Sequence, residues 1–287
     1  MERILVTGAN GQLGMALQKC ALRMDDFTFY FTDIDTLDIC DKAGMGDFIR
    51  SHAIDVIINC AAYTAVDRAE DEPALCARIN CDAVRLIGEL AAETNARVIH
   101  LSTDYVFDGC GVRPYRETDA TNPVSVYGKT KLAGEQALMN TCQRSIILRT
   151  AWLYSATGTN FVKTMLRLGT TRDTLDVVAD QHGTPTYADD LAEVIENILT
   201  AGPFTPGIYH YTNGGACTWC DFAAKIFELS GIPCIVNPIT TAAYPTRAAR
   251  PPFSVLDKTK ISDTYQISIP TWEASLEKFL RNNQHTI

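Results

Sequence analysis

Three glycines stand near the start of the chain, directly after a short apolar run. Gly8, Gly11 and Gly14 follow the apolar residues 4–6, and a helix-like stretch follows the glycines. A buried strand that turns through glycines into a helix is the first unit of a doubly wound α/β fold. Gly8 permits the tight turn, Gly11 lets backbone approach a phosphate, and Gly14 lets helix and strand pack closely. The spacing therefore predicts a dinucleotide pyrophosphate at this helix start, although the same pattern also occurs in βα turns that bind nothing.

Apolar, β-branched runs alternate with helix-like stretches through the first two thirds of the chain. The expected strands are 4–7, 28–31, 56–59, 98–102 and 146–149, and the expected helices are 12–23, 41–51, 73–93 and 126–139. The runs show no polar–apolar alternation, which is typical of strands buried on both faces of a parallel sheet. We therefore expect a doubly wound, Rossmann-type α/β fold.

The pattern becomes less regular after residue 150. Short expected strands (175–178 and 208–211) mix there with expected helices (161–168, 189–199 and 217–229). We expect a dinucleotide-binding domain over residues 1–150 with a returning segment near 175–200. Residues 151–287 are expected to form mainly a smaller substrate-binding lobe at the carboxyl edge of the sheet, where such folds bind ligands. The long segment 108–122 is predicted to be a functional loop.

Charge and cysteine usage exclude several classes of protein. The 287 residues carry a formal net charge of −9, whereas a general nucleic-acid binder is typically basic. We find no apolar stretch near the ~20 residues that span a bilayer and no secretory signal pattern, so a cytoplasmic location is expected. Of ten cysteines, Cys217 and Cys220 form a CxxC with no second pair. The prediction is reduced structural thiols and no metal site.

An acidic residue stands where a ribose-binding carboxylate is expected. Asp33 ends the second expected strand, close to the ~20 positions after the glycines that dinucleotide-binding folds show. An acid there favours NAD, but Lys42 could neutralise a 2′-phosphate, so NADPH and NADH both stay open. A turn or capping role for Asp33 is the alternative. The residues predicted to bind the cofactor here are Gly8, Asn10, Gly11, Gln12, Leu13, Gly14, Asp33, Asp38 and Ile39.

A tyrosine and a lysine stand four residues apart on an expected helix. Tyr127 and Lys131 therefore share one face. A cation about 4 Å from a phenol contributes roughly 4 kcal/mol at an effective dielectric of 20, or on the order of three pKa units. We therefore expect Lys131 to lower the pKa of Tyr127 toward 7. Thr103 closes the fourth expected strand, where its hydroxyl could hold a substrate oxygen beside Tyr127. An ordinary surface pair is the alternative for Tyr127 and Lys131.

Several longer blocks carry a family resemblance. They are residues 59–67 (NCAAYTAVD), 102–109 (STDYVFDG), 127–135 (YGKTKLAGE), 149–152 (RTAW), 180–186 (DQHGTPT) and 250–257 (RPPFSVLD). With these blocks the chain resembles the extended short-chain dehydrogenase/reductase superfamily and, within it, the dTDP-4-dehydrorhamnose reductase family. The resemblance covers nearly the whole chain. The 127–135 block is common to the superfamily, whereas the 102–109 and 250–257 blocks are much narrower.

The resemblance implies an NAD(P)H-dependent oxidoreductase. The cofactor would deliver hydride to the C4 keto group of dTDP-4-dehydro-L-rhamnose, giving dTDP-L-rhamnose. Tyr127 would be the general acid, Lys131 would bind the nicotinamide ribose and tune Tyr127, and Thr103 would complete the catalytic set. The resemblance also places Ala61, Ala62 and Tyr63 along the cofactor, and Asp104, Tyr105 and Trp152 around the sugar.

A nucleotide-sugar substrate carries a diphosphate, and the chain is acidic overall. A local guanidinium is therefore needed, because arginine contacts phosphate in bidentate fashion. Arg250 is the first candidate and Arg247 the second. A surface salt bridge is the alternative for Arg250.

Some family members are magnesium-bridged dimers that use a glutamate just after the third glycine. Met15 and Ala16 stand there in this chain, so a metal bridge of that kind is not expected. Use of magnesium and a homodimer both stay open. One rival function is a catalytically idle nucleotide-binding regulatory subunit of the same fold. The other is a nucleotide-sugar epimerase or dehydratase, which Tyr105 disfavours because a dehydratase would carry Glu after Asp104.

Overall fold

A six-stranded sheet forms the centre of the structure, a computed structural model that describes residues 1–200 and 202–283. Its strands lie in the order β10-β5-β4-β3-β1-β2, and all neighbours are parallel. Their bounds are β1 Glu2–Thr7, β2 Phe27–Thr32, β3 Val56–Asn59, β4 Arg97–Thr103, β5 Ser145–Thr150 and β10 Gly207–His210. The chain changes direction across the sheet between β1 and β3, which is where doubly wound folds bind ligands.

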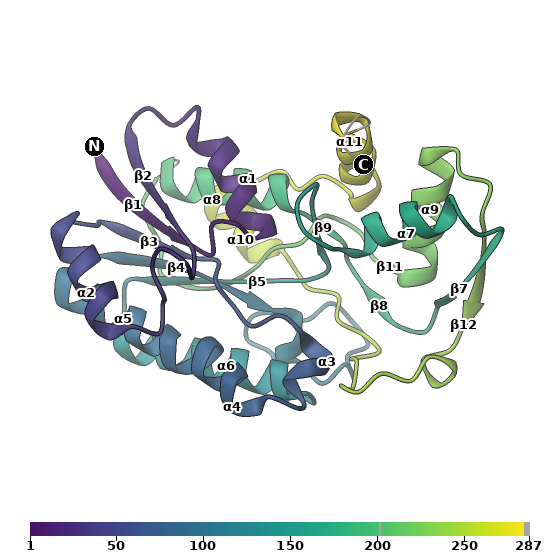
Figure 1. Ribbon diagram of the computed structural model, residues 1–287, viewed down its shortest axis with the longest axis horizontal. Helices are drawn as coiled ribbons and strands as arrows, with labels where there is room; N and C mark the ends of the chain where they lie inside the picture. The colour runs from purple at the N-terminus through teal and green to yellow at the C-terminus, as the bar shows by residue number, and fades with distance from the viewer. Residues whose placement is uncertain (201, 284–287) are drawn as a thin grey trace.

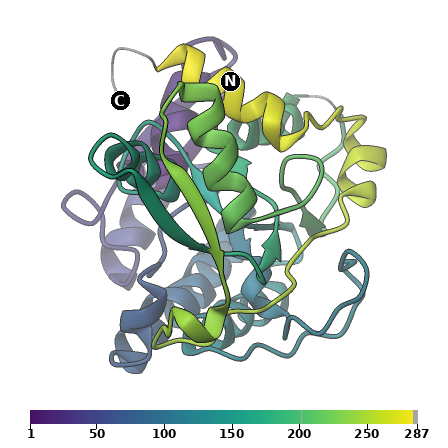
Figure 2. The ribbon, with the colours of Figure 1, turned by 90° about the vertical axis from the view of Figure 1, so that its right-hand side faces the viewer.

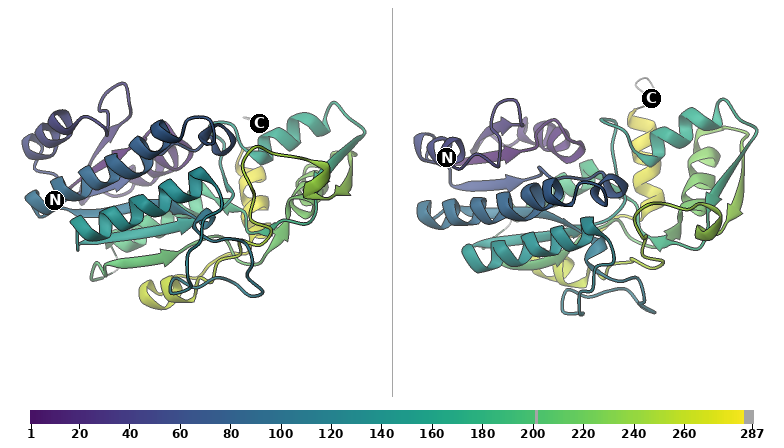
Figure 3. Two further views of the ribbon diagram at one scale, coloured as in Figure 1. Left: turned by 90° about the horizontal axis from the view of Figure 1, so that it is seen from below. Right: turned by 60° about the horizontal axis from the view of Figure 1, so that its bottom comes forward.

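Helices cover both faces of this sheet (Figures 1 and 3). One face carries α1 (Gln12–Ala21), α8 (Ala188–Thr200) and α10 (Thr259–Tyr265), and the other carries α2 (Lys42–Ser51), α5 (Ala83–Thr94) and α6 (Val126–Thr141). The predicted doubly wound α/β fold is therefore confirmed.

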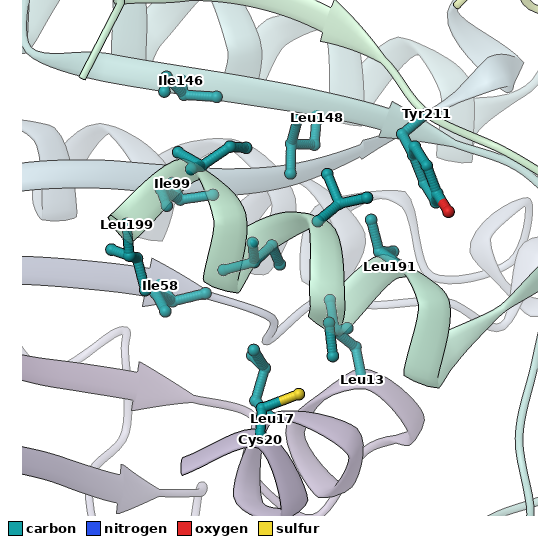
Figure 4. Packing of buried hydrophobic residues seen from close by; sticks show 14 of the residues in the cluster. Leu13, Leu17, Cys20, Ile58, Ile99, Ile146, Leu148, Leu191, Leu199 and Tyr211 are labelled. Atoms are coloured by element: carbon teal, nitrogen blue, oxygen red, sulfur yellow. The ribbon is translucent and has the colours of Figure 1, made fainter. Parts of the chain in front are cut away.

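Alternate residues of the central strands enter two separate cores. Ile4 and Val6 of β1 pack with α1 and α8, whereas Leu5 packs with α2 and α5. Figure 4 shows the first core, in which Leu17 of α1 and Leu191 of α8 approach the sheet. Because both faces are buried, consecutive positions such as 4–6 of β1 and 56–58 of β3 are all apolar, which explains the unbroken runs in the sequence.

The helix expected over 73–93 is divided into three parts. Pro73 starts α4 (Pro73–Ala77), a π-helical turn follows over Arg78–Asp82, and α5 then begins at Ala83. Short α3 (Val66–Ala69) precedes them. Apolar spacing does not reveal a π-turn, which inserts one residue into a continuous helical path.

A smaller lobe stands beyond the carboxyl edge of the sheet (Figures 1 and 2). Its core joins α7 (Phe161–Gly169), α9 (Trp219–Ser230) and α11 (Trp272–Asn282) with the parallel strand pair β7 (Thr174–Val178) and β12 (Ile235–Ile239). Two short strand pairs complete it: β6 Leu153–Tyr154 with β9 Thr186–Tyr187, and β8 His182–Gly183 with β11 Cys217–Thr218. Two 3₁₀ turns, at Asp104–Val106 and Thr241–Ala243, follow β4 and β12. The chain returns to the main sheet with α8, β10 and α10.

Three helices of the C-terminal third differ from expectation, and one of them, α10, lies in a segment for which no helix is expected. The helix expected over 217–229 begins at Trp219, because Thr218 caps it by exchanging hydrogen bonds with Asp221. Helix α11 was not predicted, although Trp272, Leu276 and Phe279 repeat at helical spacing and are all buried. No helix within residues 1–200 and 202–283 has the length and apolar character needed to cross a membrane.

A buried ion pair ties α6 to the middle of the sheet. The Arg149 Nη2 atom on β5 lies 2.6 Å from Glu135 Oε2 on α6, and its Nε lies 2.9 Å from Oε1. Both side chains are at most 2% exposed. Ser102 of β4 also donates to Glu135, and the Arg149 guanidinium lies over the ring of Phe107. The pair therefore fixes where α6 sits across β4 and β5.

We expect Arg149→Met to destabilise the fold by about 3–5 kcal/mol, because it leaves the Glu135 carboxylate buried without its cation. The matched control is Arg50→Met, which breaks the exposed Arg50–Asp47 pair and should cost about 1 kcal/mol or less. Urea unfolding followed by circular dichroism measures both. Equal losses in the two variants would show that the buried pair does not hold α6.

Candidate active site

A cavity of about 970 Å³ opens at the carboxyl edge of the sheet, a volume at the upper end for small-molecule sites. Most residues predicted for the site line it: Gly8, Asn10, Gly11, Gln12, Leu13, Gly14, Asp33, Asp38, Ile39, Ala61, Ala62, Thr103, Asp104, Tyr105, Tyr127, Lys131 and Trp152. Tyr63 and Arg250 are not among the lining residues. The two motifs that lie about a hundred residues apart in the sequence therefore face one space.

The glycine turn at the end of β1 has the geometry that a pyrophosphate needs. Gly8 has a φ of +66°, and a Cβ there would lie 2.6 Å from the backbone nitrogen of Ala61. A Cβ on Gly14 would lie 2.4 Å from the Gly8 oxygen, so only glycine lets α1 approach this closely. Gly11 is the N-cap of α1 and provides no side-chain cap. The first N–H groups of α1 and the positive end of its dipole are thus available to an anion.

Acidic groups line the end of the cavity next to β2. The Asp33 carboxylate accepts from the backbone nitrogens of Asn10 (2.9 Å) and Ile34 (2.8 Å), and Asp38 accepts from Cys40. Arg78, from the π-helical turn, also lines this cavity. Sequence reasoning missed Arg78 because it searched only near Asp33, and no local pattern links the two positions. The fold thus places a carboxylate and a guanidinium at the same end of the site.

Tyr127 lies at the start of α6, where Ser125 caps the helix by accepting from the Gly128 nitrogen at 3.1 Å. Its ring meets that of Tyr105 edge to face, with centroids 5.7 Å apart. Burial raises the pKa of Tyr127 above its ordinary value, and the neighbouring Thr103 hydroxyl only partly offsets this rise. The expected fall of this pKa toward 7 is therefore wrong for the structure.

The position of the Lys131 ammonium explains this difference. Its Nζ donates to the Leu101 carbonyl at 2.5 Å and lies 3.4 Å from His100 Nε2. The side chain is 2% exposed, and burial lowers its pKa to about 8. Lys131 is not among the groups that shift the pKa of Tyr127. The four-residue spacing correctly placed both side chains in the cavity but did not show that Nζ turns toward β4.

Thr103 and Asp104 are coupled at the end of β4. The Thr103 hydroxyl donates to Asp104 Oδ1 at 3.0 Å and accepts from the Tyr105 nitrogen at 3.2 Å. Asp104 is 2% exposed, and its Oδ2 has no hydrogen-bond partner among the described residues. Burial raises the pKa of this carboxyl to about 6. Asp104 therefore presents an unsatisfied polar atom next to the cavity.

Two stacked indoles form another part of the wall. Trp152 has a φ of +47°, which is unusual outside glycine, and its ring stacks on Trp219 with centroids 3.5 Å apart. A Cβ on Gly183 would lie 2.6 Å from the Trp152 ring. Trp219 also lines the cavity. Sequence reasoning missed Trp219 because its segment was considered only for the cysteines around it.

Two predicted residues have partners outside the lining. Arg250 Nη2 donates to Asp67 Oδ2 at 2.6 Å, whereas its Nη1 is buried without a partner among the described residues. Tyr63 donates its hydroxyl to Glu72 at 2.7 Å. The positive charge of Arg250 lowers the pKa of Tyr105, which opposes the larger rise caused by burial. Arg250 thus acts on the cavity wall from just behind it.

The described part of the chain holds no cluster of three or more His, Cys, Asp or Glu side chains suited to a metal ion. Cys217 and Cys220 are free thiols, and burial raises the pKa of both.

Asp104 makes a testable contribution to stability. Its pKa is raised in the folded chain, so the protonated form favours folding. The stabilisation of the folded state by protonated Asp104 is complete below about pH 4 and is lost as pH rises through about 6. We therefore expect Asp104→Asn to stabilise the fold by up to about 3 kcal/mol at pH 7.5 and to have little effect at pH 4. Urea midpoints at the two pH values measure this, with the exposed Asp35→Asn as control. A pH-independent difference would contradict it.

Comparison with known proteins adds independent information. A family model described as the RmlD substrate binding domain matches residues 1–285. A dTDP-4-dehydrorhamnose reductase from Aggregatibacter actinomycetemcomitans is 44% identical over 96% of this chain and 98% of that protein. Crystal structures of dTDP-4-dehydrorhamnose reductases from Clostridium acetobutylicum (41% identity) and from Bacillus anthracis in complex with NADP (38% identity) both match with a TM-score of 0.94, over 98% of this chain and 99% of theirs. The chain therefore belongs to the dTDP-4-dehydrorhamnose reductase family.

Proposed function

We propose that this chain reduces the C4 keto group of dTDP-4-dehydro-L-rhamnose with NADPH or NADH, giving dTDP-L-rhamnose. The observation that carries the proposal is that Thr103, Tyr127 and Lys131 line the same cavity as the glycine turn. An idle binding subunit would have no need of this set. The substrate assignment is supported by relatives named dTDP-4-dehydrorhamnose reductase, which are 44% and 41% identical over 96% of this chain.

The residues assigned to the cofactor are Gly8, Asn10, Gly11, Gln12, Leu13, Gly14, Asp33, Asp38, Ile39, Ala61, Ala62, Tyr63, Tyr127 and Lys131. When bound, the reduced nicotinamide supplies a hydride to the keto carbon. The start of α1 receives the pyrophosphate. Asp33 suits a ribose 2′-hydroxyl, and Arg78 gives a 2′-phosphate a cation at the same end of the cavity. Tyr63 enters this set through the family resemblance alone, because its hydroxyl is held by Glu72.

Tyr127 acts as the general acid in this proposal. A raised pKa keeps its proton on Oη before the reaction, which is the state that a reduction requires. Thr103 and Tyr127 together hold the keto oxygen. As hydride reaches the carbon, that oxygen becomes strongly basic and takes the Tyr127 proton. In the structure the Leu101 carbonyl holds Lys131 Nζ, and Lys131 does not shift the pKa of Tyr127. Its charge therefore stabilises the remaining phenolate only when Nζ turns toward Tyr127 in the loaded enzyme.

Asp104, Tyr105 and Trp152 are assigned to the sugar, and Arg250 to the diphosphate. The unpartnered Oδ2 of Asp104 suits a sugar hydroxyl, and the unpartnered Nη1 of Arg250 suits a phosphate oxygen. Because Arg250 Nη2 is already held by Asp67, the guanidinium is oriented before the substrate arrives.

A cytoplasmic location is also proposed, because all ten cysteines of the sequence lie in described segments and are free thiols.

The oligomeric state of the chain stays open between a monomer and a homodimer. Light scattering at micromolar concentration decides between the two.

We expect Tyr127→Phe to lower kcat by about 10²-fold or more, because the acid is lost while the ring remains. Cofactor affinity, measured by fluorescence titration, should change little. Tyr30→Phe, which removes a hydroxyl from a residue of edge strand β2 that does not line the cavity, is the matched control for turnover. A Tyr127→Phe enzyme with near-normal turnover at 340 nm would remove Tyr127 from the mechanism.

Arg250→Ala should raise KM for the nucleotide sugar about tenfold or more, with a smaller change in KM for the cofactor, because a charged hydrogen bond to phosphate is lost. Arg247→Ala is the control, since Arg247 pairs with Asp71 in the same region but is largely exposed. If both variants leave the sugar KM unchanged, the diphosphate does not contact Arg250.

A further inference from the structure

A row of buried polar side chains runs across the sheet to Lys131. Thr7 Oγ1 lies 2.7 Å from Asn59 Oδ1, Asn59 Nδ2 lies 3.1 Å from His100 Nδ1, and His100 Nε2 lies 3.4 Å from Lys131 Nζ. Strand register places Thr7 opposite Asn59 and Asn59 opposite His100. All four residues are at most 2% exposed. The proposed reaction uses Lys131 but gives no role to the other three.

The imidazole in this row is neutral. His100 is fully buried, and burial together with the nearby Lys131 charge keeps its pKa well below the ordinary value. A neutral imidazole donates from one ring nitrogen and accepts at the other. If Nε2 accepts a hydrogen bond from Lys131, Nδ1 must therefore donate to Asn59. If Nε2 donates to Lys131, Nδ1 must accept from Asn59.

Two arrangements pair every donor in the row with an acceptor on the neighbouring residue. When Lys131 is an ammonium, it donates to Nε2, Nδ1–H donates to the Asn59 oxygen, and the Asn59 amide donates to Thr7. When Lys131 is an amine, Nε2–H donates to Nζ, the Asn59 amide donates to Nδ1, and the Thr7 hydroxyl donates to Asn59. In the structure the Thr7 hydroxyl donates to Asn59 Oδ1 and the Asn59 amide nitrogen faces His100 Nδ1. The Asn59 amide must therefore turn over for the first arrangement to form. A mixed arrangement would place two donors or two acceptors face to face in a dry interior.

We propose that Thr7, Asn59 and His100 form a positioning relay whose hydrogen bonds all reverse direction when Lys131 gains or loses its proton. The relay lets a buried lysine titrate without placing two donors or two acceptors face to face along the row. This inference rests on the proposed function for the claim that the charge of Lys131 matters to turnover.

The relay predicts at which pH kcat falls on the alkaline side of its pH profile. The groups facing Lys131 are Glu135 on its own helix, Cys60 after β3, Cys76 on α4 and His100 on β4. Of these, His100 alone lies within hydrogen-bond distance of Nζ. A hydrogen bond to a charged group is worth more than one to a neutral group, so His100 stabilises the ammonium more than the amine. Without His100, the ammonium is lost at lower pH.

Nitrogen-15 NMR of histidine-labelled protein tests the relay directly, in the free and the NADP⁺-bound enzyme. The chain has five histidines, and the signal absent from His100→Gln assigns His100. We expect His100 to change from the Nδ1–H to the Nε2–H tautomer, without becoming charged, as pH rises through about 8, the pKa of Lys131. In Lys131→Met it should keep one tautomer. A wild-type His100 that keeps one tautomer from pH 6 to 10 overturns the relay, whatever the activity.

Kinetics with three substitutions separate this role from a purely structural one. Asparagine reaches only the Nδ1 position and glutamine reaches the Nε2 position, whereas phenylalanine keeps the ring without nitrogens. His100→Phe and His100→Asn should move the alkaline limb of kcat down by about 0.5–1 pH unit, and His100→Gln should restore it toward wild type. Equal losses of kcat with no shift in the three variants would overturn the role of His100. If the tautomer changes but kcat does not vary from pH 7 to 10, the relay stands and the proposed role of Lys131 fails.

Discussion

The ion pair between Glu135 and Arg149 is the contact on which the site geometry depends. It joins a helix that crosses the sheet to the strand beneath it, and one turn before Glu135 the same helix carries Lys131. A buried ion pair adds little net stability compared with a well-packed apolar pair. What it provides is a single allowed position, since any other seating of α6 would leave two charges in the interior without partners. Tyr127 and Lys131 stand over the cavity because α6 cannot slide.

Other buried polar groups beneath the site also fix the positions of the side chains around them. The row from Thr7 to Lys131 and the link between Thr103 and Asp104 replace apolar contacts at the carboxyl ends of β1 and β3 and in the second half of β4. The middle of β1 and most of β3 are apolar and fully buried, so the sheet is closely packed away from the site. Buried polar side chains gather toward the carboxyl ends of the strands, where they reach the cavity or the groups that support it. They are Thr7, Asn59, His100, Ser102 and Thr103.

The sequence was sufficient for the architecture because each strand obeys one simple constraint. Residues such as Ile4, Leu5 and Val6 are apolar without interruption since both faces of the sheet are covered. Local spacing also located the glycine turn and the Tyr127–Lys131 face. It did not reveal the direction of the Lys131 ammonium, because that direction depends on His100 and Leu101 of another strand.

Local sequence patterns did not predict which residues reach the cavity from distant segments of the chain. Arg78 reaches the acidic end of the cavity from a π-helical turn, and Trp219 reaches the wall from the small lobe. Arg250 was predicted at the site but is held by Asp67, a partner 183 positions away in the chain. Neither propensity nor motif spacing contains such pairings, which arise only when the two lobes fold together.

The strained backbone at Trp152 links the shape of the cavity to the small lobe. A residue other than glycine in the left-handed region costs about 1–3 kcal/mol, so residue 152 would relax if its ring were released. Trp219 on one side and the absence of a side chain at Gly183 hold the ring in place. Helix α9, which begins with Trp219, therefore holds the Trp152 ring in place in the cavity wall. The shape of the cavity on this side therefore depends on where the small lobe places α9.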